Sequence, residues 1–150
     1  MTARVQLIVP GDPQPAERAR RGRGRWYTPP ATVEYRQRVE WAWKTARAAG
    51  FGAAPLTISA SFHLPRPVSH HGTGRNIQAV KPSCRHLLPP GDLDNYLKGL
   101  LDGLQAAGAF DNDKQVACLS GVSKHWATAG DARTEVTIWL AQPIALDTAA

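Results

Sequence analysis

Residues 91–104 read GDLDNYLKGLLDGL and contain the pattern that decides how the chain folds. Leucines recur here at i, i+3, i+4 and i+7, which is the spacing of one buried helix face. These leucines are Leu97, Leu100, Leu101 and Leu104. The spacing predicts a helix over residues 95–107, with Gly108 as its C-terminal stop. Asp92 and Asp94 stand where this helix begins, although the chain as a whole carries a net charge of +6.

A second helix is predicted upstream. Thr28 is expected to cap it and Pro29 to take its first position, where a missing N–H costs nothing. Gly50 is expected to end it. Its apolar stripe is Tyr35, Val39, Ala42 and Ala46, with Trp43 beside it.

Short runs of strand-forming residues surround the two helices. The segments with this character are 5–9, 56–64, 116–122 and 136–140. The second of them alternates with period two, and its inward-facing residues are Leu56, Ile58, Ala60, Phe62 and Leu64. The resulting order, β-α-β-α-β-β, predicts one small α/β (α+β) domain, in which a mixed sheet packs with two main helices.

Two segments lack periodicity, and the chain ends in a loose tail. The predicted domain spans residues 1–141, with a basic loop at 11–26, a flexible loop at 66–91 and the tail at 142–150. A long segment without periodicity inside a small domain is usually functional or disordered.

Composition limits the class of protein. The 18 Lys and Arg residues outnumber the 12 Asp and Glu residues, and a pI near 9.8 favours a polyanionic partner, with nucleic acid ahead of membrane. Simple solubility is the plainer explanation of this charge. Cys84 and Cys118 form no CxxC pattern, and no apolar run is long enough for a signal peptide or a membrane helix. We therefore expect a soluble cytoplasmic protein.

The aspartates before the second helix admit two interpretations. Asp94 is well placed to cap that helix, which would be a purely structural role. Asp92 lies two residues upstream, so an extended approach would put both carboxylates on one side, where they repel unless a cation lies between them. Lys98 and then Asp102 follow at four-residue intervals. They form either an ordinary helical ion pair or a phosphate-facing lysine with a supporting acid.

Further acids follow the helix, in the turn FDNDKQ. Asp111 and Asp113 lead there into a strand, and the return of the chain could bring them towards Asp92 and Asp94. Acids in turns usually serve backbone hydrogen bonds. Three carboxylates and a lysine also fit a Mg²⁺-dependent phosphodiesterase, in which the metal activates water and neutralises the phosphate.

The run DLDNYLKGLLDGLQAAG followed by DNDKQV resembles the signature of RusA-type Holliday-junction resolvases. VPGDPQPAERAR and YTPPATVEYRQRV are similar to that family's opening strand, basic loop and first helix. The resemblance implies a small α/β homodimer that cuts four-way DNA junctions with Mg²⁺, or Mn²⁺ in its place. It carries the catalytic and metal-binding acids over to Asp92, Asp94 and Asp113, and the catalytic lysine to Lys98. Asn95 and Asp102 would support them.

The sequence departs from the family signature at two points. The usual Asp-Asp pair is Asn112-Asp113 here, which puts in question any role of the first acid in metal affinity. Lys81-Pro82 resembles a dipeptide that normally stands just before the DLDN motif. The stretch between it and Asp92 is longer than the family leads us to expect, so Lys81 need not occupy the family position.

Five arginines lie between residues 18 and 25, with glycines among them. The DNA-binding candidates there are Arg18, Arg20, Arg21, Arg23 and Arg25. Trp26 and Tyr27 follow and could stack on an exposed base, while the other tryptophans are expected in the core. Lys114 and Lys124 are further phosphate candidates. The plainer alternatives are a flexible basic loop and ordinary surface lysines.

The function expected from the sequence is Mg²⁺-dependent resolution of four-way DNA junctions by paired symmetric nicks, in DNA recombination and repair. Two rivals remain: a non-catalytic basic DNA-binding module, whose acids only cap and turn, and a general Mg²⁺-dependent flap or duplex nuclease. A ribonuclease and a zinc site are weaker alternatives. The zinc site would use His70, His71, Cys84 and His86, at a spacing that matches no familiar pattern.

Overall fold

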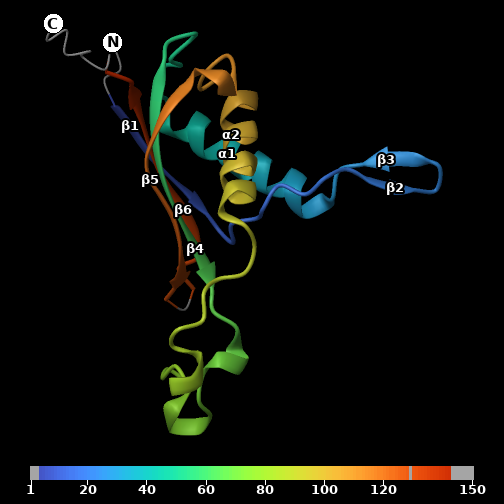
Figure 1. Ribbon diagram of the computed structural model, residues 1–150, viewed down its shortest axis with the longest axis vertical. Coiled ribbons are helices and arrows are strands. Elements are labelled where there is room, and N and C mark those ends of the chain that lie inside the picture. The colour runs from blue at the N-terminus through green and yellow to red at the C-terminus, as the bar shows by residue number, and fades with distance from the viewer. Residues whose placement is uncertain (1–3, 129, 143–150) are drawn as a thin grey trace, which may run out of the picture.

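The computed structural model describes residues 4–128 and 130–142, which form a four-stranded sheet, a separate two-stranded hairpin and two α-helices (Figure 1). The strands are β1 (Arg4–Pro10), β2 (Arg20–Gly22), β3 (Arg25–Tyr27), β4 (Leu56–Pro65), β5 (Val116–Ala127) and β6 (Arg133–Leu140). The helices are α1 (Pro30–Ala46) and α2 (Leu93–Ala106). Four 3₁₀ turns are η1 (Val68–His70), η2 (Gly74–Asn76), η3 (Pro82–Cys84) and η4 (Asp113–Gln115).

The main sheet is mixed, with strand order β1-β6-β4-β5. β4 and β5 run parallel and are joined through α2, because parallel neighbours need a crossover connection. β6 lies antiparallel to both β1 and β4. The predicted fold class and element order are therefore confirmed, and the β2–β3 hairpin is an addition to them.

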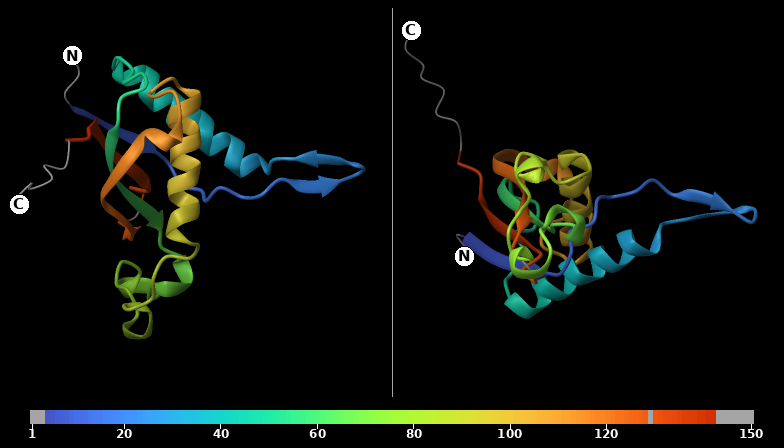
Figure 2. Two further views of the ribbon diagram at one scale, coloured as in Figure 1. Left: turned by 45° about the horizontal axis from the view of Figure 1, so that its top comes forward. Right: turned by 90° about the horizontal axis from the view of Figure 1, so that it is seen from below.

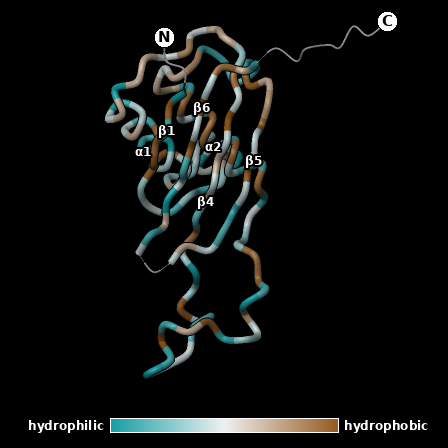
Figure 3. The backbone as a smooth tube through the Cα atoms, turned by 90° about the vertical axis from the view of Figure 1, so that its left-hand side faces the viewer, coloured by the Kyte–Doolittle hydropathy of each residue, from teal (hydrophilic) through white to brown (hydrophobic). Residues whose placement is uncertain are grey.

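Both helices pack on one face of the sheet (Figures 1 and 2). All five residues expected to face inward from the second predicted strand are buried, each 6% exposed or less. Every second residue of β1 is likewise buried. Figure 3 shows how apolar and polar residues are distributed along the strands. The core thus lies between the helices and the alternating apolar positions of the strands.

The buried face of α2 is rotated from the predicted leucine stripe. Leu100 and Leu104 are fully buried, but Leu97 and Leu101 are only partly covered. Gly99 and Gly103 occupy the buried face instead, because α1 approaches α2 closely there. A Cβ atom on Gly103 would lie 2.8 Å from the Cβ of Val39.

The predicted ends of the first helix are wrong. It begins at Pro30, and Pro29 occupies the N-cap position without a side-chain cap, so Thr28 does not cap it. It ends at Ala46, which is exposed, because Arg47 takes a left-handed conformation (φ 50°) before Gly50 is reached.

The loop predicted over residues 11–26 is wrong in its second half, where β2 and β3 form a hairpin. Arg23 (φ 46°) and Gly24 (φ 82°) make a two-residue turn of the kind that joins antiparallel strands. The arginine-rich composition hid this turn, since Arg rarely takes positive φ. The hairpin projects away from the sheet (Figure 1).

The remaining predictions concern termini, tryptophans and membrane segments. Residues 66–91 contain η1 to η3 and no longer element, and the tail beyond Gln142 lies outside the described residues. Trp41 is 58% exposed, so the expectation of a core position is wrong for it, whereas Trp43 is buried. Within the described chain, no helix has the length and apolar character needed to cross a bilayer.

Candidate active site

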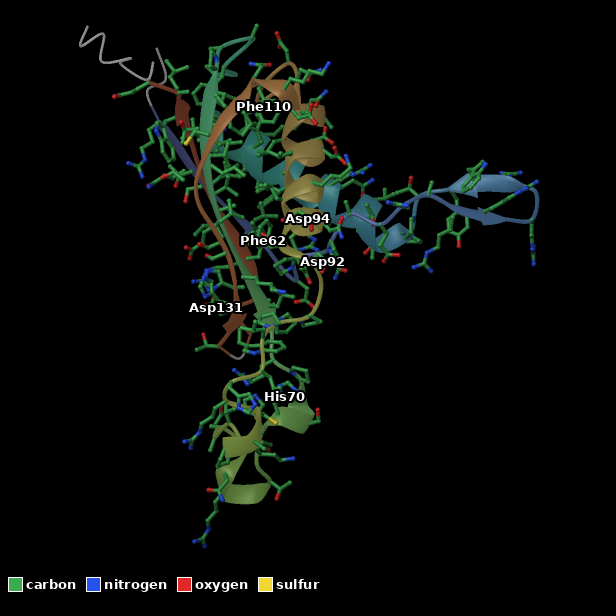
Figure 4. All side chains as sticks on the ribbon, in the orientation of Figure 1. Phe62, His70, Asp92, Asp94, Phe110 and Asp131 are labelled. Atoms are coloured by element: carbon green, nitrogen blue, oxygen red, sulfur yellow. The ribbon has the colours of Figure 1, made fainter. Side chains whose placement is uncertain are left out.

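Asp92 and Asp94 line one open groove together with two arginines of the basic segment. Figure 4 places both aspartates at the N-terminal end of α2. The groove has a volume of about 700 Å³. Its lining residues are Pro15, Ala16, Glu17, Arg18, Ala19, Arg20, Gly91, Asp92, Asp94 and Asn95. The acid pair and the first two arginines of the run, Arg18 and Arg20, are more than 70 residues apart in sequence but meet in space.

Neither aspartate caps the helix with its side chain. α2 begins at Leu93, two residues earlier than predicted, so Asp94 lies in the first helical turn and the alternative interpretation of Asp94 as the cap is wrong. Asp92 holds the N-cap position with extended backbone, yet its carboxylate makes no cap hydrogen bond. Both residues are exposed, and neither forms an ion pair with another described residue. Both carboxylates are thus available to a cation.

The backbone before Asp92 is held in place from two sides. Gly91 has φ +83°, and a Cβ atom there would lie 2.9 Å from the ring of Tyr96. The Tyr96 hydroxyl donates to the carbonyl of Pro90 (3.0 Å), and burial raises the pKa of Tyr96, which keeps this donor protonated. Lys124 Nζ donates to the Gly91 carbonyl (2.5 Å). These contacts fix the direction in which Asp92 enters the groove.

The opposite wall of the groove is held against α2 by backbone contacts. The N–H of Ala16 donates to the carbonyl of Asn95 (2.8 Å). Gly99 permits this approach, because a Cβ atom there would lie 3.3 Å from the Gln14 carbonyl oxygen. Glu17, which sequence reasoning missed, pairs with Arg20 in the same wall, so part of the arginine charge is already neutralised.

Lys98 lies one turn after Asp94 on α2, and its side chain is 63% exposed. Its Nζ lies 3.8 Å from Oδ1 of Asp102. The other oxygen of Asp102 accepts a hydrogen bond from Arg36 Nη2 on α1 (2.7 Å). Asp102 therefore joins Lys98 to the neighbouring helix, and Arg36 is a partner that only the fold reveals.

Asp113 does not join the acid pair within one chain. It lies in η4, after the C-terminal end of α2, and the 14 residues of that helix span roughly 20 Å. Figure 4 places Phe110, which precedes this turn, at the opposite end of α2 from Asp92 and Asp94. Across residues 4–128 and 130–142, no three or more His, Cys, Asp or Glu side chains are grouped so that they could hold a metal ion.

The turn that carries Asp113 is built by its neighbours. Asn112 Oδ1 accepts from the N–H of Lys114 (2.9 Å), and Gln115 Oε1 accepts from the N–H of Asn112 (2.7 Å), which is a capping box. Gln115 Nε2 also donates to the carbonyls of Gly52 (2.6 Å) and Ala54 (2.8 Å). Asn112, where the family signature has an acid, thus has a structural role as the cap of η4.

The remaining cations lie in different places. Lys114 lies in η4. Lys124 is paired in register with buried Phe62, so its side chain faces the helices, beside Gly91.

On the hairpin, Arg21 lies opposite Trp26, and Arg20 lies opposite Tyr27. All five arginines of the segment are exposed, as is Trp26 (70%).

Comparison with known proteins identifies the family of the chain. A profile of the family described as Endodeoxyribonuclease RusA matches residues 10–139, which include the hairpin, the groove and η4. No curated protein sequence matches the chain closely enough to count as a relative. Because the profile covers most of the 150 residues, the chain belongs to the RusA endodeoxyribonuclease family.

Proposed function

We propose that this protein is a Mg²⁺-dependent endodeoxyribonuclease that resolves four-way DNA junctions by paired, symmetric nicks, in DNA recombination and repair in the cytoplasm. The family supplies the class, a Holliday-junction resolvase nuclease. The observation that carries the proposal is that Asp92 and Asp94, free of caps and ion pairs, share a groove with Arg18 and Arg20. Two such carboxylates repel each other and the DNA unless a cation lies between them.

The residues present fit a magnesium ion. Mg²⁺ is commonly bound through one or two carboxylates, with water and substrate phosphate completing its shell. Asp92 and Asp94 would hold it, and the open groove leaves room for phosphate and water. When bound, the ion would supply positive charge to the phosphate and make a water molecule more acidic.

The protein's own cations would handle the phosphate backbone. Arg18 lies in the groove wall with exposed charge and would bind the phosphate next to the acids. Lys98 would stabilise the negative charge that builds up during cleavage. Asp102 would position Lys98, because its second oxygen is tied to Arg36 and its orientation is therefore restricted.

Asp113 keeps its proposed role only if a second copy of the chain supplies it. It lies about a helix length away from Asp94 in the same chain, so one chain alone presents two of the three carboxylates at the groove. A two-fold dimer presents every surface twice and could bring Asp113 of one copy to the groove of the other. The proposed homodimer would then complete two sites, one for each nick.

The rival interpretations make different predictions. A non-catalytic binding module would use the acids to cap α2. Asp92 does occupy the N-cap position, but its side chain makes no capping hydrogen bond. This geometry favours the nuclease. A general flap or duplex nuclease has the same chemistry and differs only in substrate preference.

Mg²⁺-dependent cleavage of a labelled four-way junction, with linear duplex and flap DNA of the same sequence, tests the proposal. Paired symmetric nicks in the junction alone are expected. Equal cutting of flap or duplex would support the general nuclease. Tight binding without cutting in Mg²⁺ or Mn²⁺ would support the binding module.

A further inference from the structure

Residues 66–90, between β4 and α2, form a positively charged lobe, which we call the basic lobe. It contains Arg66, Arg75, Lys81 and Arg85, three histidines, and no aspartate or glutamate. The lobe projects below the sheet in Figure 1 and is separate from the β2–β3 hairpin. Its charge is therefore a second basic surface outside the groove and the hairpin.

The lobe has a defined internal structure. Besides the turns η1 to η3, His71 and Val80 form an antiparallel bridge. Lys81 Nζ donates to the Ser69 carbonyl (2.9 Å), and Arg66 Nη1 donates to the Cys84 carbonyl (3.0 Å). These contacts join the two halves of the segment and restrain the side chains of Arg66 and Lys81.

Trp126 of β5 anchors the lobe to the sheet. Its indole N–H donates to the Leu87 carbonyl (2.6 Å), the ring of His70 meets it edge-on (5.5 Å between centroids), and Arg66 lies over its face (4.9 Å). From this anchor the chain continues through Pro90 and Gly91, which Tyr96 and Lys124 hold, directly into Asp92. The lobe is thus connected to the acid pair by an ordered segment.

The cations at the outside of the lobe are not neutralised by acids. Arg75 and Arg85 are exposed and form no ion pair with any described residue. Lys81 is also exposed and is engaged only by a backbone carbonyl. Arginine at an open surface, with its guanidinium free, is suited to bidentate contact with phosphate.

The hairpin and the lobe leave the body of the protein in different directions, and the end of α2 that carries Asp92 lies between their roots (Figures 2 and 4). If DNA is cut at Asp92, as proposed above, one basic element would lie on each side of the cut. A linear duplex along the groove and the hairpin would then leave the lobe unoccupied. A further branch of the DNA could reach it.

We propose that the basic lobe is a second DNA-binding arm, which contacts the phosphate backbone of a further helical arm of branched DNA. This inference rests on the proposed function, since it assumes that branched DNA occupies the groove. Contacts of this kind are independent of sequence, raise affinity and steepen its salt dependence. They give the chain a way to prefer a junction over a duplex.

The test compares Arg75→Gln/Arg85→Gln with Arg4→Gln/Arg47→Asn, which removes two charges outside the groove, hairpin and lobe. The binding of a four-way junction and of a linear duplex is measured between 50 and 200 mM salt in Ca²⁺, about the range over which phosphate contacts are resolved. The lobe variant should lower the junction's log–log salt slope by about 0.9 per lost phosphate contact and leave the duplex slope nearly unchanged. The control should change neither slope.

Three other results overturn the proposal, each in a recognisable way. If the lobe variant binds the junction with an unchanged salt slope, the lobe does not contact DNA, and the proposed function still stands. Equal loss for junction and duplex overturns the assignment to a further arm. If the unaltered protein binds no DNA, the proposed function and the lobe assignment both fail.

A charge-reversal variant, Arg75→Glu/Arg85→Glu, with its fold checked by circular dichroism, should lower the salt slope of junction binding further.

Discussion

Asp102 on α2 accepts a hydrogen bond from Arg36 on α1 (2.7 Å), while its other oxygen lies 3.8 Å from Lys98 Nζ. One carboxylate thereby ties the two helices together and restrains the lysine beside the acid pair. The interhelical contact and the proposed catalytic lysine therefore depend on the same side chain, and substitutions can separate their roles.

Asp102→Asn should destabilise the protein, whereas Lys98→Gln should not. Removing the carboxylate charge leaves a half-buried Arg36 poorly paired, at a cost of about 1 kcal/mol, or roughly 3 °C in Tm. Lys98 is mostly exposed, so its loss should leave Tm unchanged and lower junction cleavage about 100-fold. Thermal unfolding and single-turnover cleavage measure the two effects.

Lys44→Gln is the matched control, because Lys44 forms the same i,i+4 pair with Glu40 on α1, away from the groove. It should change neither Tm nor cleavage. Normal cleavage by Lys98→Gln would remove Lys98 from the mechanism and leave Asp102 as a purely structural residue.

Sequence patterns predicted those features that depend on local spacing. The period-two run of β4 and the DLDN signature were enough to place the strand and the acids at the start of α2. The exact helix start was mispredicted, because Asp94 is a good cap by residue type and the extended backbone that decides the cap belongs to Asp92. The preference of aspartate for the N-cap position cannot decide which of two aspartates, two residues apart, occupies that position.

Relationships over long sequence distances could not be predicted. Arg18 meets Asp92 because the segment before β2 is held against α2 through Ala16 and Asn95. Arg36 meets Asp102 because α1 packs against α2. The length of α2 separates Asp113 from Asp94, although the sequence suggested a turn that brings them together. Composition likewise concealed the β2–β3 hairpin, since its turn places an arginine at positive φ.

The hairpin should contribute charge and stacking separately. Arg21→Gln/Arg23→Gln/Arg25→Gln should reduce the salt slope of junction binding by up to about 2.7, because three phosphate contacts are lost. Trp26→Ala should weaken binding without changing the slope, since stacking releases no counterions. Fluorescence anisotropy across a salt series measures both effects. Arg20 is left in place because it pairs with Glu17, and an unchanged slope in the triple variant would reduce the hairpin to solvated surface.

His63 should make the folded state sensitive to acid. Burial, the Arg133 guanidinium and His125 lower the pKa of His63 from the ordinary 6.5, and this outweighs the opposing effect of Glu135 and Asp131. The unfolded chain therefore binds the proton more readily. The stability that neutral His63 contributes is present above pH 6.5 and is lost as the pH falls through the folded-state pKa.

Urea unfolding at pH 7.5 and pH 5.5, values chosen about one unit to either side of the ordinary histidine pKa, measures this dependence. His63→Gln should reduce the loss of stability between them, while His86→Gln, at an exposed position, should leave it as it is. If His63→Gln and the unaltered protein lost the same unfolding free energy between these two pH values, His63 would not be the source of the acid sensitivity.

Mixed dimers test the origin of Asp113 at the site. If each groove takes Asp113 from the second copy, a dimer of Asp94→Asn with Asp113→Asn contains one fully intact site and one site that carries both changes. Mixing the two inactive variants should then restore nicking of a single strand. If all ligands came from one chain, both sites would be damaged, and the mixture would stay inactive on a junction gel.

The central claim is that the Asp92–Asp94 pair cuts DNA and does not merely shape the helix start. Single-turnover cleavage of a four-way junction in Mg²⁺, with binding of the same junction measured in Ca²⁺, tests it in Asp92→Asn, Asp94→Asn and the surface control Asp12→Asn. The account predicts at least about 100-fold slower cutting in the first two variants, with equal or tighter binding because a charge that repels phosphate is gone. Cutting at the native rate by either variant would contradict the account.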